Sequence, residues 1–123
     1  MPLIEEKTMQ KILKHSYTKL AEEHRQRVEN HLRHVPTEVT FKANKKLRKL
    51  FLAMSDEELM ELYLIIMLGR RNPKGDVLKV YNELFALEKR YFNRNDKIVY
   101  LLGLETLHDE LVEGLAFFKQ IAS

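Results

Sequence analysis

The chain has 123 residues, of which 45% are hydrophobic and 32% charged, and its formal net charge is +3. This balance is typical of one globular domain and excludes extensive disorder. Cysteine is absent, which excludes disulfides and thiolate chemistry.

The amino-terminal stretch MPLIEEKTMQKIL carries acidic residues where a signal peptide needs basic ones, and no long apolar run follows it. We therefore expect a cytoplasmic protein. Glycine and proline are few, at 4 and 3, while leucine, lysine and glutamate dominate. This usage predicts an all-α fold, a single domain of five or six helices around a central apolar helix.

The first predicted helix is long, because nothing from Leu3 to about His34 breaks a helix. At 1.5 Å per residue it would span roughly 48 Å, more than the diameter of a small domain. Its second half, residues 22–34, has only Val28 and Leu32 as large apolar residues. Such a thin seam is typical of a contact between helices of a homodimer. The alternative is a solvated helix end that lies across its own domain.

Pro36 ends this helix, and a second one is expected over Phe41–Met54. Its expected inward face is apolar. The opposite face is strongly basic and carries Lys42, Lys45, Lys46, Arg48 and Lys49.

The central helix is predicted to follow Ser55, which with Glu58 forms a capping box. Beyond the first turn its apolar residues leave almost no polar face, so neighbours must surround it. The acidic residues at 56–58 and Glu61 are interpreted as capping or solvated side chains. Gly69 is expected to stop the helix in the left-handed conformation. The apolar run is about ten residues, half the ~20 that a bilayer requires, which predicts a core helix.

Two helices should follow the basic break after Gly69. Asp76 is a suitable N-cap for a helix to about Tyr91. Residues 93–96 form a turn-type cluster, and the apolar run 98–102, closed by Gly103, predicts a helix of one or two turns.

The last helix should run from about Glu105 to Ile121, so residues 41–122 form the helical core. Gly114 lies inside this helix, where glycine costs about 1 kcal/mol relative to alanine. A close crossing with another helix would explain it.

The histidines are a candidate metal site, since His15, His24, His31 and His34 share the first helix. His31 and His34 lie three residues apart, but no third ligand accompanies them on that face. Glu105 and His108 have the spacing of a di-iron carboxylate motif, yet only one copy exists. The acidic residues Asp109, Glu110 and Glu113 are interpreted as solvated. No catalytic constellation, metal or cofactor is predicted, so the chain is interpreted as not an enzyme.

Positive charge is the best functional candidate. If the basic residues of the second helix converge with Arg70, Arg71 and Lys74, they form a patch able to hold phosphates. The alternative is a solvated basic face balanced by neighbouring acids.

Several short motifs occur together in the second half of the chain, over residues 44–116. They are Leu47 with Leu50, Ser55-Asp56-Glu57-Glu58-Leu59 with Glu61-Leu62, Leu68-Gly69-Arg70, and Tyr100-Leu101-Leu102-Gly103 followed by Leu107, Leu111 and Glu113-Gly114-Leu115. In this pattern the chain resembles an uncharacterised, mostly bacterial, all-helical family of unknown function. The resemblance implies no established activity. We hypothesise that Arg70 packs against the carbonyl end of the turn at 98–102 as a clamp across the core.

Two functions follow as expectations. The first is a non-enzymatic, homodimeric protein-interaction or assembly module with Val28 and Leu32 as its seam. The alternative is a nucleic-acid-associated accessory protein that uses the basic face of the second helix.

Overall fold

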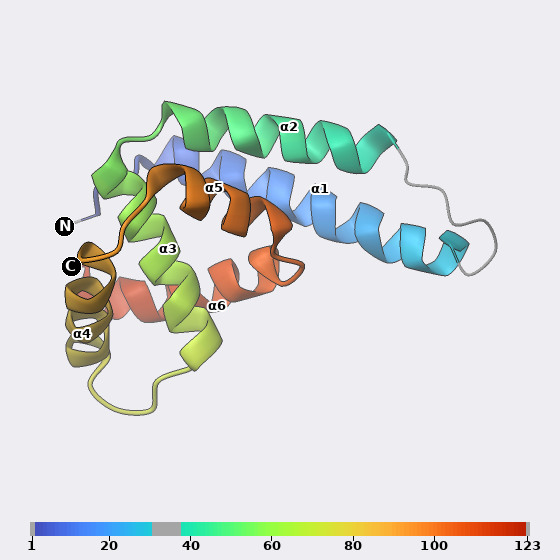
Figure 1. Ribbon diagram of the computed structural model, residues 1–123. Coiled ribbons are helices and arrows are strands. Elements are labelled where there is room, and N and C mark those ends of the chain that lie inside the picture. The colour runs from blue at the N-terminus through green and yellow to red at the C-terminus, as the bar shows by residue number, and fades with distance from the viewer. Residues whose placement is uncertain (1, 31–37, 123) are drawn as a thin grey trace.

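A computed structural model describes residues 2–30 and 38–122, except for the side chains of residues 22–23, 25–30 and 38–41. These residues form a single bundle of six helices without strands, which confirms the all-α prediction (Figure 1). The helices are α1 (Glu6–Asn30), α2 (Glu38–Ala53), α3 (Asp56–Arg71), α4 (Val77–Lys89), α5 (Arg94–Gly103) and α6 (Leu107–Ile121).

Helix α3 lies at the centre of the bundle, as predicted. The capping box is present: Ser55 Oγ accepts from the Glu58 backbone N–H at 3.1 Å, and Glu58 Oε1 accepts from the Ser55 N–H at 3.0 Å. Every residue of α3 from Leu59 to Gly69 except Tyr63 is buried. No helix among the described residues is both long and apolar enough to cross a bilayer.

Helices α3 and α6 cross backbone to backbone at two glycines. A Cβ on Gly114 would lie 1.8 Å from the Ile65 carbonyl oxygen, and one on Gly69 would lie 1.9 Å from that of Glu110. The predicted close crossing at Gly114 is therefore confirmed. The predicted stop at Gly69 is wrong, because Gly69 lies inside α3. The helix ends at Asn72, which has the left-handed φ of 48° and donates its N–H to the Leu68 carbonyl.

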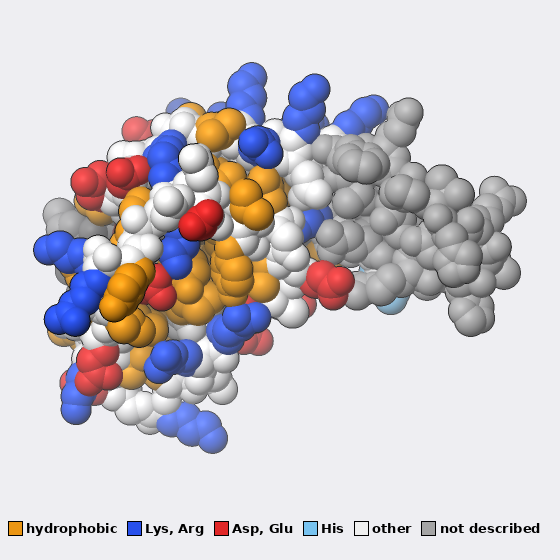
Figure 2. Space-filling model, viewed as in Figure 1, with side chains coloured by type: hydrophobic (Ala, Val, Ile, Leu, Met, Phe, Trp, Pro, Cys, Tyr) orange, Lys and Arg blue, Asp and Glu red, His pale blue; other side chains and the backbone are white. Residues whose placement is uncertain are grey.

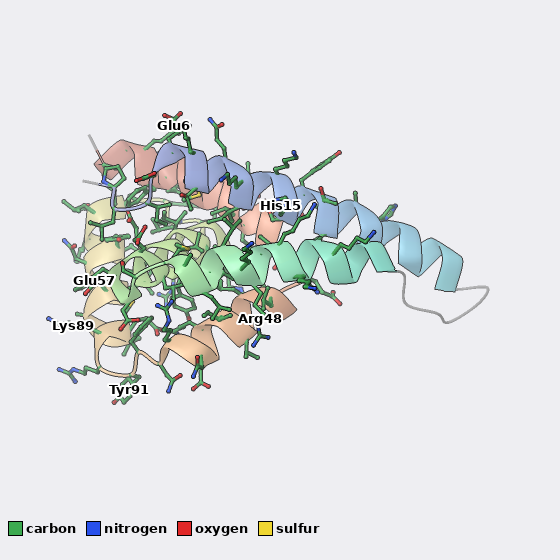
Figure 3. All side chains as sticks on the ribbon, turned by 90° about the horizontal axis from the view of Figure 1, so that it is seen from above. Glu6, His15, Arg48, Glu57, Lys89 and Tyr91 are labelled. Carbon is green, nitrogen blue, oxygen red and sulfur yellow. The ribbon has the colours of Figure 1, made fainter. Side chains whose placement is uncertain are left out.

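Helices α1 and α2 run antiparallel, side by side, and project past the other helices (Figures 1 and 3). The far half of α1, for which the sequence left a homodimer contact or a solvated helix end as alternatives, lies beside α2 of the same chain (Figure 1). Helix α2 begins at Glu38, three residues before the predicted start. Helix α1 begins at Glu6, whereas the sequence predicted a start at Leu3.

The amino-terminal ends of α4 and α5 are capped by side chains. Asp76 Oδ1 accepts from the Lys79 N–H at 3.1 Å, which confirms the predicted cap. Asn93 Oδ1 accepts from the Asp96 N–H at 3.0 Å in the same way, so α5 begins at Arg94. The predicted turn at 93–96 is therefore the cap and first turn of a ten-residue helix.

Two charged side chains are buried against backbone groups. Glu61, which is 4% exposed, accepts from the N–H groups of Leu3 at 2.7 Å and Ile4 at 3.2 Å. The prediction that Glu61 is solvated is wrong, because its carboxylate anchors the amino-terminal segment. Lys19, which is 3% exposed, donates from α1 to the Leu102 carbonyl at the end of α5 and lies 3.5 Å from the Leu104 carbonyl.

The clamp predicted for Arg70 takes a different form. Its Nη1 donates to the Tyr100 hydroxyl at 2.7 Å, and its Nε donates to Glu110 Oε1 at 3.2 Å. The carbonyl end of α5, where Arg70 was expected, is contacted by Lys19 instead. Arg70 remains half exposed, so it bridges α5 and α6 at the surface rather than across the core.

Candidate nucleic-acid interface

Four lysines of α2 surround a shallow hollow of about 250 Å³. They are Lys42, Lys45, Lys46 and Lys49, all exposed. Their spacing of three and four residues places them on one face of the helix, where the methylene stems line the hollow and the ammonium groups reach solvent. Figure 2 shows lysine and arginine side chains projecting along the upper edge, over α2. Arg48 lies on the other side of α2, away from α1 (Figure 3).

Helix α1 adds lysines to the same region. His15 lies on the side of α1 that faces α2 (Figure 3). Its pKa is lowered by burial and, next in size, by the positive charges of Lys46, Lys14 and Lys11. Lys11 and Lys14 are exposed. Lysines of both α1 and α2 therefore lie near enough to His15 to lower its pKa. We define the lysine surface as Lys11, Lys14, Lys42, Lys45, Lys46 and Lys49.

No carboxylate among the described side chains forms an ion pair with the lysine surface. The ion pairs between described side chains join Arg70 to Glu110, Arg94 to Asp56, and Lys97 to Glu88. None of them includes a residue of the lysine surface. The alternative interpretation, a basic face balanced by neighbouring acids, is thus not supported for the described part of the chain.

The second basic group does not join the first. Arg70 and Arg71 end α3, and this end of α3 lies at the opposite side of the molecule from α2 (Figure 1). Arg70 is also engaged by Glu110 and Tyr100. The condition for one joint patch, that Arg70, Arg71 and Lys74 converge with the lysines of α2, is therefore not met, because α3 crosses the bundle and carries its last turn away from α2 (Figure 1).

The predicted dimer seam falls outside the described side chains. Val28 belongs to α1, but its side chain is not described, and Leu32 lies outside the described residues. The same holds for His31 and His34. The seam remains a prediction.

Ser16 and His108 form a serine–histidine contact between α1 and α6. Ser16 Oγ lies 2.9 Å from His108 Nδ1 and donates to the Leu13 carbonyl at 3.0 Å. Ser16 is 2% exposed, and its hydroxyl hydrogen is already used. This geometry fits a buried structural link between α1 and α6 rather than an activated nucleophile.

Among the side chains that the structure describes, no three from His, Asp or Glu lie close enough together to hold a metal ion. One carboxylate oxygen of Glu110, Oε2, is buried without a hydrogen-bond partner. It lies beside the α3–α6 crossing, on a residue whose other oxygen binds Arg70.

Comparison of the chain with protein-family models, curated proteins and solved structures yields no match. The family resemblance therefore rests on its motifs alone and stays a prediction. The motif residues do meet in space. Gly69 and Gly114 lie at one crossing, and Arg70 contacts Tyr100.

Proposed function

We propose that this protein is a non-enzymatic accessory protein that binds nucleic acid through the lysine surface. The observation that carries the proposal is the presence of six exposed lysines on two neighbouring helices, four of them around one hollow and none in an ion pair with another described side chain. The sequence alone pointed to the α2 half of this surface.

The chemistry of the surface favours phosphate contacts that do not depend on base sequence. Lysine is a compact, mobile point charge that binds phosphate without the fixed geometry of arginine. The hollow is lined by lysines, without an aromatic ring on which a base could stack. Binding should therefore track the charge of the nucleic-acid backbone and weaken as salt displaces it.

Binding of a fluorescent mixed-sequence oligonucleotide, measured by anisotropy over a range of salt, tests the proposal. If all six lysines contact phosphates, the logarithm of the affinity should fall against the logarithm of salt with a slope of roughly −5. The triple variant K45Q/K46Q/K49Q should bind more weakly, and its slope should be less steep by roughly 3.

A matched triple variant controls for net charge. K74Q/K79Q/K119Q removes the same charge from exposed lysines outside the lysine surface. It should leave most of the affinity intact. Equal loss in both triple variants would contradict a localised site, and an affinity that is insensitive to salt would contradict phosphate binding altogether.

A homodimeric protein-interaction module is the second candidate function. The observation that favours it is a set of exposed apolar side chains on α4 and the amino-terminal segment, with Leu3, Leu78 and Phe85 each more than 40% exposed. This surface differs from the Val28–Leu32 seam that the sequence predicted. Light scattering coupled to size-exclusion chromatography of variants in each surface distinguishes the two.

A further inference from the structure

A groove opens between α3, α4 and the amino-terminal segment, at the end of the bundle that holds both termini (Figure 1). We call it the α3–α4 groove. It measures about 340 Å³, and its walls include the apolar side chains of Met60, Phe85 and Phe92. Binding sites in proteins are commonly hollows of this order of size with mostly apolar walls.

Two polar residues that line the groove, Glu61 and Tyr81, are wholly or partly buried. Glu61 Oε2 is occupied by the Leu3 and Ile4 N–H groups. Burial is also the largest effect on Tyr81, and together with Glu61 it raises the pKa of Tyr81 to about 12, so the phenol stays protonated. The open part of the groove is thus mainly apolar.

Two exposed apolar side chains of α4 lie at the groove and at a smaller hollow that adjoins it. Phe85 is 42% exposed and lines the groove itself. Leu78, two helical turns earlier on α4, is 50% exposed and lines a smaller adjoining hollow of about 160 Å³. Residues seven apart share one face of a helix. Helix α4 therefore presents two apolar projections on the face that holds two hollows.

The two walls carry opposite charges. Glu57 of α3 and Lys89 of α4 both line the groove, and Figure 3 shows them at the same end of the bundle. Neither forms an ion pair with another described residue, whereas the neighbouring Asp56 is paired with Arg94 at 3.0 Å. A partner that fits this rim must offer a cation opposite Glu57 and an anion opposite Lys89.

We infer that the occupant of the α3–α4 groove is a second copy of this chain, related by a two-fold axis through the groove. In such an interface residue i meets residue j, and j meets i, so opposite charges on the two walls become complementary. Glu57 of each protomer faces Lys89 of its partner. Phe85 of each protomer enters the partner's groove and covers the exposed apolar face. This contact does not depend on the lysine surface.

The first test is the mass in solution of the full chain, measured by light scattering during size-exclusion chromatography over a range of concentrations. The wild type should have the mass of two chains. Phe85→Asp places an uncompensated charge at the centre of the contact, so the dimer dissociation constant should rise roughly thirtyfold or more. Leu78→Asp should act in the same direction. Because both residues are exposed, circular dichroism should show that both variants fold.

The matched control is Val99→Asp, which changes an apolar residue of α5 that is 66% exposed and lines neither hollow. It should remain dimeric. A monomeric wild type at the highest concentration would overturn the inference. So would a dimer that survives Phe85→Asp and dissociates with Val28→Asp, because that result would place the contact on α1.

Charge reversal tests the two-fold geometry. Glu57→Lys and Lys89→Glu should each weaken the dimer, by roughly two- to fivefold, since exposed ion pairs contribute little. The double variant restores opposite charges across the axis and should recover the wild-type dissociation constant. Additive weakening in the double variant would overturn the two-fold arrangement.

Discussion

At the crossing of α3 and α6 the chain has no room for a side chain, whereas at Lys19 and Glu61 a long charged side chain reaches backbone groups of another segment. Gly69 and Gly114 lie inside two continuous helices and let their backbones touch. The Leu102 carbonyl at the end of α5 and the N–H groups of Leu3 and Ile4 instead bond to the side chains of Lys19 and Glu61. Steric fit therefore decides the stability of the α3–α6 crossing. Pairing of backbone hydrogen-bonding groups decides the stability of the contacts at Lys19 and Glu61.

The largest expected loss of stability comes from a substitution at the α3–α6 crossing. Gly114→Ala places a Cβ against the Ile65 carbonyl, and because the obstacle is backbone, α3 and α6 must move apart. Overpacking of this kind costs about 3 kcal/mol or more, which corresponds to a fall in melting temperature of roughly 10 °C. Differential scanning calorimetry measures this change.

Gly103→Ala is the control for this prediction. A Cβ at Gly103 meets no atom within 4 Å, and its φ is not positive. The substitution should leave stability unchanged or raise it by up to about 1 kcal/mol. An equal change in stability at Gly103 and Gly114 would contradict the steric explanation, because only a Cβ at Gly114 meets the backbone of another helix.

Of the two glycines at the crossing, only Gly114 had a structural role that the sequence predicted correctly. Gly114 lies inside an apolar helix with no break after it, so a close crossing was its simplest explanation, and this was correct. Gly69 precedes a polar, proline-containing stretch, where a helix stop and a close crossing have the same local pattern. Only the position of α6 distinguishes the two, and that position depends on contacts distant in sequence.

Local signals predicted the helix caps, and distant contacts decided the rest. The side chains of Ser55 and Asp76 cap their helices through residues three positions ahead, which a sequence displays directly. Glu61 was misjudged because carboxylates are usually solvated, although a helix apolar on all sides leaves little solvent to reach. Lys11 and Lys14 were missed as members of the basic surface because only the pairing of α1 with α2 brings them near Lys46.

An intermediate effect is expected at Lys19. Lys19→Met keeps the length and apolar stem of the side chain but removes the donor to the Leu102 carbonyl. A buried acceptor left without a partner costs about 1–3 kcal/mol, reduced here by the release of a buried charge. Urea unfolding should show a loss of about 2 kcal/mol for Lys19→Met. Lys14→Met, an exposed lysine of the same helix, should stay within about 0.5 kcal/mol of wild type. Equal stabilities of Lys19→Met and Lys14→Met would contradict a stabilising role for the hydrogen bond from Lys19 to the Leu102 carbonyl.

The smallest effect is expected at Glu61 and depends on pH. Burial, the largest influence, raises the pKa of Glu61 above its ordinary value of 4.5, although the Leu3 and Ile4 N–H groups oppose the shift. The folded state thus holds the proton more tightly than the unfolded state. Its contribution to stability is complete below pH 4.5 and is lost as pH rises through the folded-state pKa.

Glu61→Gln isolates this dependence, because the amide oxygen still accepts from Leu3 and Ile4 while the ionisable group is gone. The stability of the variant relative to wild type should therefore increase from pH 4.5 towards neutral pH, as the wild-type carboxylate ionises in its buried site. Thermal melts of both proteins across this range measure the difference. Glu83→Gln, an exposed carboxylate of α4, corrects for the loss of one negative charge. A difference that stays constant with pH would mean that the Leu3 and Ile4 N–H groups compensate the carboxylate fully, so burial would impose no net cost on its charge.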